Sequence, residues 1–466
     1  MMSNSKSLQL YDTATREVNE FKPLVAGEVS MYVCGATVQA APHIGHVRSG
    51  VNFDILRRWL IKSGYKVTFI RNVTDIDDKI LQKAVVEGMP WWALAMKYER
   101  IFTAAYASLN VLPPTYEPRA TGHITQMIDL MALLIEKGAA YAPGNGDVYL
   151  EVRKLDRYLT LSRQHIDDLQ PAQDADETYK KDVRDFALWK AAKPGEPSWP
   201  TPWGAGRPGW HLECSAMAYA YLGETFDIHG GGLDLVFPHH ENEIAQSEAA
   251  GYGFAKRWLH NAWVTQSGEK MSKSLGNTLQ VHEILKSVRG IELRWYLGGA
   301  HYRSMLEYSP EALQEAATNF RRIENFLTRA TELLGVQPIP KVSSEFSAAM
   351  NDDLAVPAAL ATISENLRLG NQAITDNDLA AISKNADEIR GALEVLGCDP
   401  FDEAFASSGG SELSQVIDGL IKLALAERAA ARERKDFAAS DAIRDGLSAL
   451  GITIEDTAQG PRWSIS

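Results

Sequence analysis

Residues 29–70 read VSMYVCGATVQAAPHIGHVRSGVNFDILRRWLIKSGYKVTFI and carry the strongest fold signal of the chain. Residues 29–33 are a short apolar run, residues 51–61 place apolar side chains at helical spacing, and residues 65–70 are rich in β-branched and aromatic types. Strand, helix and strand in this order predict a right-handed crossover between two parallel strands. We therefore expect an α/β domain built on a Rossmann-like parallel sheet.

The sequence after this unit first continues and then loses the alternation. Residues 91–109 and 124–137 have the apolar spacing of amphipathic helices. Residues 138–208 hold short strand-like pieces and a stretch rich in Pro, Gly and Trp, which indicate an insertion rather than a sheet core. Strand-like residues 226–229 resume the alternation, and we expect the glycines 230–232 to form a turn.

From about Ser309 the composition shifts to Ala, Leu, Glu and Arg at helical spacing, which predicts a helical bundle. A Ser/Gly-rich linker at residues 407–411 then isolates a small C-terminal piece with helix and strand signals. The expected order is the first half of the Rossmann-like catalytic domain (1–137), a connective insertion (138–208), the second half (209–265), a lysine-loop region (266–308), the α-helical bundle (309–406) and a small C-terminal α+β domain (411–466).

Composition excludes several classes of protein. The 466 residues are 45% apolar, which excludes intrinsic disorder, and the net charge of −13 argues against indiscriminate binding to nucleic acid but allows a local basic face. Three cysteines are too few for a disulfide framework and point to a reducing compartment. The sequence has a polar N-terminus and lacks any run of about 20 apolar residues, so we expect a cytoplasmic protein with no membrane segment.

The sequence PHIGH at residues 42–46 lies between the first predicted strand and a helix that we expect to begin near Val47. A loop entering a helix presents unpaired N–H groups and the positive end of the helix dipole, which suit a phosphate. His43 and His46 can donate to that phosphate, and Gly45 lets a flat ring approach the backbone. The alternative is that the histidines simply cap the helix, and the motif alone leaves both interpretations open.

The sequence GEKMSKSLGN at residues 268–277 is the second motif. Lys270 and Lys273, with hydroxyls beside them and glycines on both sides, are typical of a cationic loop that closes on a triphosphate and stabilises departing pyrophosphate. A solvated surface loop is the alternative. The presence of the histidine motif in the same α/β domain favours phosphate chemistry.

Together the two motifs resemble the signature motifs of class I aminoacyl-tRNA synthetases, and further blocks narrow the resemblance to the cysteinyl-tRNA synthetase family. These blocks are YVCG at 32–35, NVTDIDDK at 72–79, GWHLECSAM at 209–217, FDIHGGG at 226–232 and FPHHENEIAQ at 237–246. The resemblance covers nearly the whole chain. It implies that the cysteine carboxylate attacks the ATP α-phosphate to give cysteinyl adenylate and pyrophosphate, and that the terminal ribose hydroxyl of tRNA then takes the cysteinyl group.

The resemblance also implies roles for single residues. His43, His46, Lys270 and Lys273 would stabilise the phosphates, with Mg²⁺ accompanying ATP, although no dedicated carboxylate cage for that ion is evident. ATP contacts are expected from His43, Gly45, His46, Gly230, Gly231, Asp234, Lys270 and Lys273. The glycines suit close approach of adenine and ribose, and Asp234 can accept from ribose hydroxyls, although a glycine run by itself is a weak signal.

A metal site is only weakly indicated by spacing. His239 and Glu243 are four residues apart and share one face of a helix that we expect to start near His239, whereas Cys34 and Cys214 form no C-x-x-C pair. Spacing alone favours buried structural cysteines. The resemblance, however, implies that the family's four ligands to one zinc ion per chain correspond to Cys34, Cys214, His239 and Glu243.

A metal would solve a problem of selectivity. An apolar pocket discriminates cysteine from serine only weakly, whereas zinc binds thiolate strongly and hydroxyl poorly. No segment is large enough for an editing domain. We expect the cysteine pocket to comprise Cys34, Thr74, Trp210 and His229, with ordinary core packing as the alternative for each; Cys398 is expected to be structural.

The C-terminal piece carries a basic stripe. Arg428, Arg432 and Lys435 fall at i, i+4 and i+7, with Arg434 beside them, and such a run is usually a solvated face. The piece resembles the family's anticodon-binding end, which turns the stripe and Trp463 into a predicted tRNA surface. Many relatives have Trp where this chain has Phe437, so the stacking aromatic is not decided.

These observations predict a monomeric ligase that uses L-cysteine, ATP and tRNA(Cys). One rival is a ligase that joins cysteine to an amino sugar, which by resemblance lacks the tail at residues 411–466. The other is a non-catalytic RNA-binding paralogue, against which the two intact motifs speak.

Overall fold

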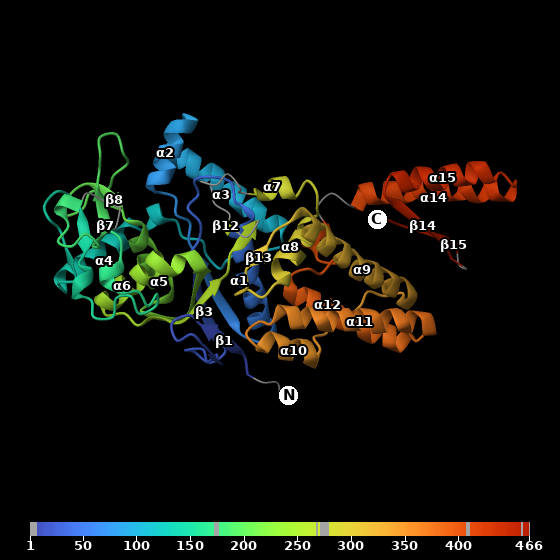
Figure 1. Cartoon of the computed structure of the whole chain (residues 1–466), viewed down its shortest axis with the longest axis horizontal. Helices are drawn as coiled ribbons and strands as arrows, with labels where there is room; N and C mark the ends of the chain where they lie inside the picture. Colours follow the sequence, from blue (N-terminus) through green and yellow to red (C-terminus); the bar gives the residue numbers. More distant parts are fainter. Residues whose placement is uncertain are drawn as a thin grey trace. The chain divides into compact units, whose positions relative to one another are not determined.

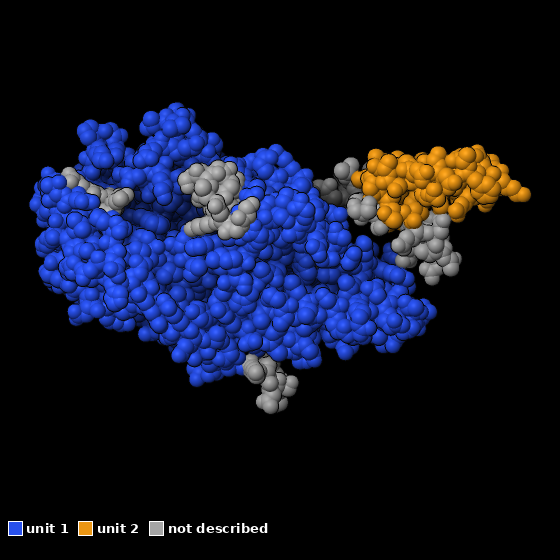
Figure 2. All heavy atoms as spheres, viewed as in Figure 1, with its two compact units in different colours: residues 1–399 blue, residues 400–466 orange. Residues whose placement is uncertain are grey.

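The structure is a computed structural model of the whole chain (Figure 1). It describes residues 7–171, 177–266, 269–270, 279–406, 411–457 and 460–465. The chain divides into two compact units, residues 1–399 and residues 400–466, which are considered separately below (Figure 2).

The first unit is organised around a four-stranded parallel sheet. Its strands are β3 (Glu28–Val33), β4 (Lys66–Arg71), β9 (Thr225–Gly232) and β10 (Phe254–Asn261), in the order β10-β9-β3-β4. The predicted α/β fold with a Rossmann-like parallel sheet is confirmed. The chain leaves β3 for β4 on one side and later returns to β9 on the other, so the strand order reverses between β3 and β9. In open parallel sheets, ligands bind beyond the carboxyl ends of the strands at such a point.

Alternation along β9 determines which helices cover each face. A Cβ atom at Gly230 would lie 2.3 Å from the ring of Phe53 in α1 (Ile44–Lys62), whereas the neighbouring His229 bonds Glu243 in α6 (Glu241–Ala250). Successive residues of a strand point to opposite faces, so α1 covers one face and α6, which contacts α5 (Trp210–Leu222), covers the other. The predicted turn at residues 230–232 is wrong, because these glycines continue β9.

The insertion between residues 138 and 208 contains a sheet of its own, in which the expected short strand-like pieces pair with one another. Four antiparallel strands in sequential order compose it: β5 (Ala140–Tyr141), β6 (Val148–Leu150), β7 (Phe186–Ala191) and β8 (Gly206–Pro208). Its strands contribute buried residues such as Leu150, Phe186 and Trp189 to the same core as Phe226 of β9. The smaller sheets of this unit comprise the hairpin of β1 (Gln9–Asp12) and β2 (Glu17–Glu20), and the group of β11 (Val264–Gln266), β12 (Glu269–Lys270) and β13 (Leu306–Glu307).

Helices make up most of the remaining first unit. Around the sheet lie α2 (Asp78–Glu87), α3 (Trp91–Ser108), α4 (Ile124–Glu136), α7 (Val281–Ile284) and α8 (Gly290–Gly299). The helical region comprises α9 (Pro310–Leu334), α10 (Ser344–Asn351), α11 (Val356–Asp376) and α12 (Leu379–Leu396). Short single-turn helices are η1 (Ala120–His123), η2 (Val152–Lys154), η3 (Ile166–Asp168), η4 (Glu177–Tyr179), η5 (Leu233–Leu235) and η6 (Val236–His240). The ends of α9 follow from sequence, because Ser309 caps its first turn and Gly335 supplies a left-handed residue (φ 70°) at its end.

The second unit has the predicted helix and strand content. It holds α13 (Glu403–Ala406), α14 (Ser411–Glu433), α15 (Phe437–Ala449) and the antiparallel pair β14 (Ile452–Thr457) and β15 (Gly460–Ile465). Among the described residues of the chain, no helix combines the length and the apolar character needed to span a bilayer.

Candidate active site and metal centre

A cavity of about 390 Å³ opens beside the carboxyl ends of β3, β9 and β10. Several sequence-predicted residues line it, namely Cys34, His43, Gly45, His46, Trp210 and Asp234. Its position matches the point where the strand order reverses, so the sheet topology itself places these residues together.

The histidine motif both caps α1 and faces this cavity. The Nδ1 atom of His43 accepts from the Gly45 N–H at 3.1 Å, and the Nδ1 atom of His46 accepts from the His43 N–H at 3.2 Å. The two rings stack with centroids 3.7 Å apart. A neutral imidazole that accepts at Nδ1 carries its hydrogen at Nε2. Capping also explains why α1 begins at Ile44 rather than near Val47.

The lysine motif is described only in part. Lys270 belongs to β12, whose backbone pairs with Thr265 of β11, and nothing is described of its side chain. Lys273 lies outside the described residues. The cationic role predicted for both lysines therefore remains a prediction.

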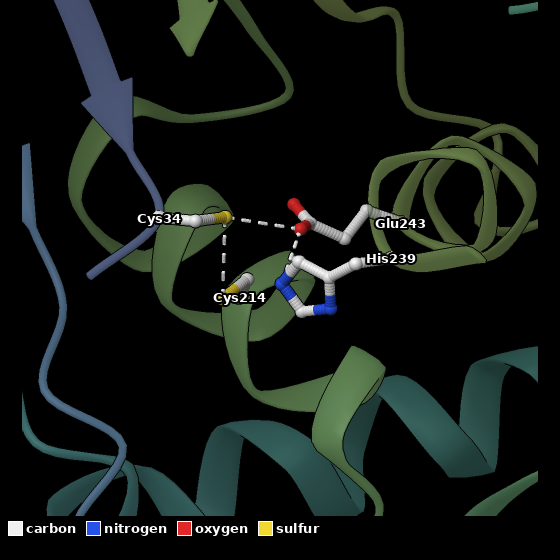
Figure 3. Close-up of side chains that lie close together, drawn as sticks. All are labelled: Cys34, Cys214, His239 and Glu243. Atoms are coloured by element: carbon white, nitrogen blue, oxygen red, sulfur yellow. Dashed lines mark hydrogen bonds and ion pairs between the residues drawn. The ribbon is translucent and has the colours of Figure 1, made fainter. Parts of the chain in front are cut away.

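Four side chains from three segments converge beneath the cavity (Figure 3). The Sγ atom of Cys34 lies 3.7 Å from the Sγ atom of Cys214 and 3.2 Å from Oε1 of Glu243, and Nε2 of His239 lies 2.9 Å from the same oxygen. All four ligand atoms lie within 4.8 Å of one another. Cys34 directly follows β3, Cys214 lies in the second turn of α5 rather than at its start, and His239 precedes α6.

These separations fit one tetrahedral zinc ion. Two sulfurs bound at about 2.3 Å with tetrahedral angles would be about 3.8 Å apart, and an N–O pair bound at about 2.0–2.1 Å would be about 3.4 Å apart. The S–S separation of 3.7 Å agrees closely, and the other pairs need to open by only a few tenths of an ångström. Two thiols, an imidazole and a carboxylate also form a donor set that zinc prefers.

Opposite charges are coupled within the cluster. Burial opposes ionisation of Cys214, but the hydrogen bond from Cys34 and the nearby His239 lower the pKa of its thiol to about 6. Burial also disfavours a charged His239, yet Glu243 and Cys214 raise its pKa to about 10. Against the cost of burial, His229 and His239 hold the pKa of Glu243 well below its ordinary value, whereas burial and Cys214 raise the pKa of the Cys34 thiol well above its own. The positive charge of the cluster is thus the proton on His239, which a metal ion bound at that nitrogen would displace.

A second layer of histidines surrounds the ligands. The Nε2 atom of His229 lies 2.7 Å from Oε2 of Glu243, and Nδ1 of His211 lies 3.0 Å from Nδ1 of His239. His240 and His260 bond one another at 2.8 Å, and burial is the main cause that lowers the pKa of both rings. Sequence reasoning missed His211, His240 and His260, although the doublet at residues 239–240 was a signal for one of them.

Of the four residues predicted to form the cysteine pocket, two line the cavity and two are buried and do not line it. Cys34 and Trp210 line the cavity, and the Trp210 ring stacks on His239 with centroids 4.2 Å apart. Thr74 is buried and donates to Oε2 of Glu213 at 2.9 Å, and burial raises the pKa of that carboxyl well above its ordinary value. His229 is fully buried against Glu243 and does not line the cavity.

The first two glycines of the run are closely packed against other elements. A Cβ atom at Gly230 would collide with Phe53, and one at Gly231 would lie 2.9 Å from His240. Neither residue lines the cavity, whereas Gly232 and the exposed Asp234 do. The contacts with adenine and ribose expected from Gly230, Gly231 and Asp234 remain predictions.

The cavity contains two cationic residues that sequence reasoning did not single out. Arg71 ends β4, pairs with Glu117 at 2.5 Å and lies over the ring of Tyr106 at 4.0 Å. Lys79 is exposed and lines the same cavity. Its place in the block at residues 72–79 was the available signal for Lys79.

The predicted basic stripe is not continuous on one helix. Arg428 is buried, with 5% of its surface exposed, whereas Arg432 and Arg434 are exposed. Lys435 lies beyond the end of α14 in a left-handed conformation (φ 61°), and the Asp436 N–H bonds back to Ala431 in the manner of a helix-ending turn. Exposed basic groups therefore gather at the helix end rather than along one face.

Comparison with known protein families gives three matches in chain order. Residues 20–318 match the family described as tRNA synthetases class I (C) catalytic domain, and residues 345–398 match the DALR domain. Residues 422–463 match the cysteinyl-tRNA ligase anticodon binding domain.

Curated relatives align over nearly the whole chain. A protein of Streptomyces avermitilis is 58% identical over 463 residues, covering 98% of this chain and 99% of that protein. One of Streptomyces coelicolor is 58% identical over 464 residues, covering 98% and 75%, and one of a Nocardioides species is 57% identical over 470 residues, covering 99% and 100%. All three are named cysteine–tRNA ligase.

A solved structure shares the fold. Methionyl-tRNA synthetase of Mycobacterium tuberculosis in complex with methionyl-adenylate superposes with a TM-score of 0.59 at 15% identity, covering 80% of this chain and 92% of that one. At this identity the likeness concerns the fold alone.

Proposed function

The chain belongs to the cysteinyl-tRNA synthetase family, and from this premise we propose how its residues divide the reaction. The protein joins L-cysteine to tRNA at the expense of ATP, through a cysteinyl adenylate, with AMP and diphosphate as by-products. The observation that supports the division is the position of Cys34, which belongs to the four-residue cluster and also lines the cavity shared with His43 and His46.

We assign the phosphate chemistry to the two motifs. His43 and His46 would donate through Nε2 to the phosphates, and Lys270 and Lys273 would stabilise the pyrophosphate that leaves, while Mg²⁺ accompanies ATP. Such donors accelerate transfer because they are already oriented toward the charge that develops. The carboxylate of cysteine attacks the α-phosphate, so the chain needs to position the reactants more than to move protons.

We assign one zinc ion per chain to Cys34, Cys214, His239 and Glu243. A bound zinc would supply thiophilic recognition of the substrate side chain, which an apolar pocket cannot provide for a single exchange of sulfur for oxygen. Three of the four ligands are buried, and Cys34 is the one on the cavity wall. The substrate thiol would therefore reach the cluster from the side of Cys34 and Trp210.

We assign tRNA(Cys) recognition to the second unit, with Arg432, Arg434, Lys435 and Trp463 as candidate contacts. The anticodon-binding match over residues 422–463 favours tRNA over an amino-sugar acceptor. The chain is proposed to act as a cytoplasmic monomer, with the domain boundaries given by the sequence. Deleting residues 411–466 should spare amino-acid activation but impair charging of tRNA.

Pyrophosphate exchange tests the proposal directly. Labelled pyrophosphate should enter ATP in the presence of cysteine and absence of tRNA, with serine as the matched control. Metal analysis of the purified chain should give about one zinc per polypeptide. Exchange of equal rate with serine would refute thiol selection, and absence of exchange with cysteine would refute activation.

A further inference from the structure

Arg48 is a fully buried arginine in α1, two residues after His46. Its Nη1 atom donates to the carbonyl oxygens of Ala262 at 2.8 Å and Trp263 at 2.7 Å, and its Nη2 atom donates to those of His301 at 3.3 Å and Ser304 at 2.6 Å. No carboxylate among the described residues forms an ion pair with it. Its contacts are therefore to backbone on two separate segments.

Both segments lead into the small sheet that carries the start of the lysine motif. Residues 262–263 connect β10 to β11, and residues 301–304 precede β13, which pairs with β11 in parallel register. The Leu306 N–H completes this arrangement by donating to the Trp263 carbonyl at 3.0 Å. Strand β11 in turn pairs Thr265 with Lys270 of β12. Arg48 thus joins the helix of the first motif to the base of the second.

The far side of the lysine motif is joined to the same helix start by backbone bonds. The Ile44 N–H donates to the Leu279 carbonyl at 3.0 Å, and the Val281 N–H donates to the Pro42 carbonyl at 3.2 Å. Residues 262–264 and the histidine motif also line one cavity. The chain on both sides of residues 271–278 is therefore connected to the N-terminal part of α1. The preceding side is connected through Arg48, and the following side through backbone hydrogen bonds.

Burying an arginine costs desolvation free energy, so its presence here indicates that the geometry of the guanidinium is needed. Burial lowers the pKa of Arg48 to about 10, so the group stays charged near neutral pH without a counter-ion beside it. A guanidinium is a planar fork that can serve several carbonyls at fixed angles, whereas a lysine ammonium is a compact group on a flexible stem. Four carbonyls in two segments match the fork and not the ammonium.

We propose that Arg48 is a positioning residue for adenylate formation, which sets the spacing between the histidine motif and strand β11. This inference rests on the function proposed above. Displacement of a reacting geometry by about 1 Å can cost about 100-fold in rate. Loss of the fork should therefore lower the turnover of amino-acid activation while leaving the metal cluster and the binding of cysteine unchanged.

Arg294 provides a matched control. It is also fully buried, and it donates to the carbonyls of Leu396, Leu109 and Asn110. Unlike Arg48 it also pairs with a carboxylate, that of Asp54 at 2.6 Å, and its contacts lie away from the cavity. Arg48→Lys and Arg294→Lys should therefore both reduce thermal stability. Only Arg48→Lys should reduce kcat for cysteine-dependent pyrophosphate exchange, by about 10- to 100-fold, with the KM for cysteine and the zinc content within about twofold of the parent, as expected for a geometric effect alone.

The comparison uses the full chain, with kcat normalised to folded protein. Unchanged kcat in Arg48→Lys, or an equal loss of kcat in both variants, would overturn the positioning role. If Arg48→Lys does not fold, Arg48→Gln keeps one N–H₂ group for part of the carbonyl set and supports the same comparison. Failure of the parent chain to exchange with cysteine would instead overturn the proposed function, and the role of Arg48 with it.

Discussion

Replacing His229 tests whether the second layer of histidines supports the metal centre. His229 is fully buried, its Nε2 atom lies 2.7 Å from Oε2 of Glu243, and its ring stacks on Trp258 with centroids 4.5 Å apart. His229→Phe keeps an aromatic ring for the stack but removes the donor to the carboxylate. The expected result is weaker zinc binding in a folded protein.

The size of the effect follows from two independent estimates. A hydrogen bond to a charged group contributes about 1.5–3 kcal/mol, which corresponds to about 10- to 150-fold in affinity. Loss of a group that orients a metal ligand typically costs 10- to 100-fold. Both estimates apply because Glu243 is fully buried, so bulk solvent does not replace the lost donor.

Competition with a chelator of known affinity measures the zinc dissociation constant. His229→Gln retains an N–H donor near the position of Nε2 and should recover part of the affinity. His123→Phe is the control, since His123 is also buried but bonds Arg119 and Tyr221 away from the cluster. Zinc affinity within twofold of the parent in His229→Phe, or an equal loss in His123→Phe, would refute the reasoning.

Three further substitutions test other parts of the structure. Asp54→Asn should lower the free energy of unfolding by about 3–5 kcal/mol, because it breaks a buried ion pair with Arg294. Burial opposes ionisation of Asp54, but the arginine charges lower its pKa. The ion pair therefore stabilises the fold above the unfolded pKa of about 3.9, and this contribution is lost as the pH falls through the lower pKa of the folded state. The difference in urea midpoint between parent and variant should therefore be full at pH 7 and shrink as the pH falls below about 3.9. Gly230→Ala should lower stability by about 1–3 kcal/mol in thermal unfolding, because its Cβ atom would lie 2.3 Å from the Phe53 ring, and an unchanged midpoint would contradict this packing. Lys273→Ala should lower pyrophosphate exchange by about 100- to 1,000-fold, the loss expected for one oxyanion donor, whereas near-normal exchange would remove it from the phosphate site.

Apolar periodicity predicted those helices and strands whose sequence signals lie within the element itself. The parallel sheet, α3 and α4 follow from apolar spacing within each segment, and the start of the helical region at Pro310 follows from spacing together with the cap Ser309. The hairpin of β1 and β2 was missed because its second strand is fully exposed and has no apolar alternation. Short strands in the insertion were missed as a sheet for a related reason, since antiparallel pairing across residues 140–208 depends on contacts remote in sequence.

Prediction of individual site residues from the sequence failed for the same reason, because their contacts are remote in sequence. Cys34 and Cys214 are 180 positions apart, so no spacing rule could unite them, and only resemblance identified the ligand set. The glycines at 230 and 231 were misread because a glycine run favours turns, whereas here α1 and His240 approach β9 too closely for a side chain. The burial of Arg428, which is 5% exposed, could not be read from helical spacing, because spacing within one helix does not reveal which other segments pack against it.

One loop connects the metal cluster to the histidine motif. It leaves β3 with Cys34, a member of the metal cluster, and reaches α1 at His43, the cap whose ring faces the cavity. Backbone bonds pin this loop to its neighbours, since the Cys34 N–H donates to Gly230 and the Val38 N–H donates to Thr74. In the function proposed above, a cysteine molecule held by its thiol at the start of the loop would be presented by this segment to the phosphate donors at the end of the loop. Selection of the side chain and activation of the carboxylate would then depend on one backbone geometry, because a substrate that is not held at the thiol end would not be aligned at the other.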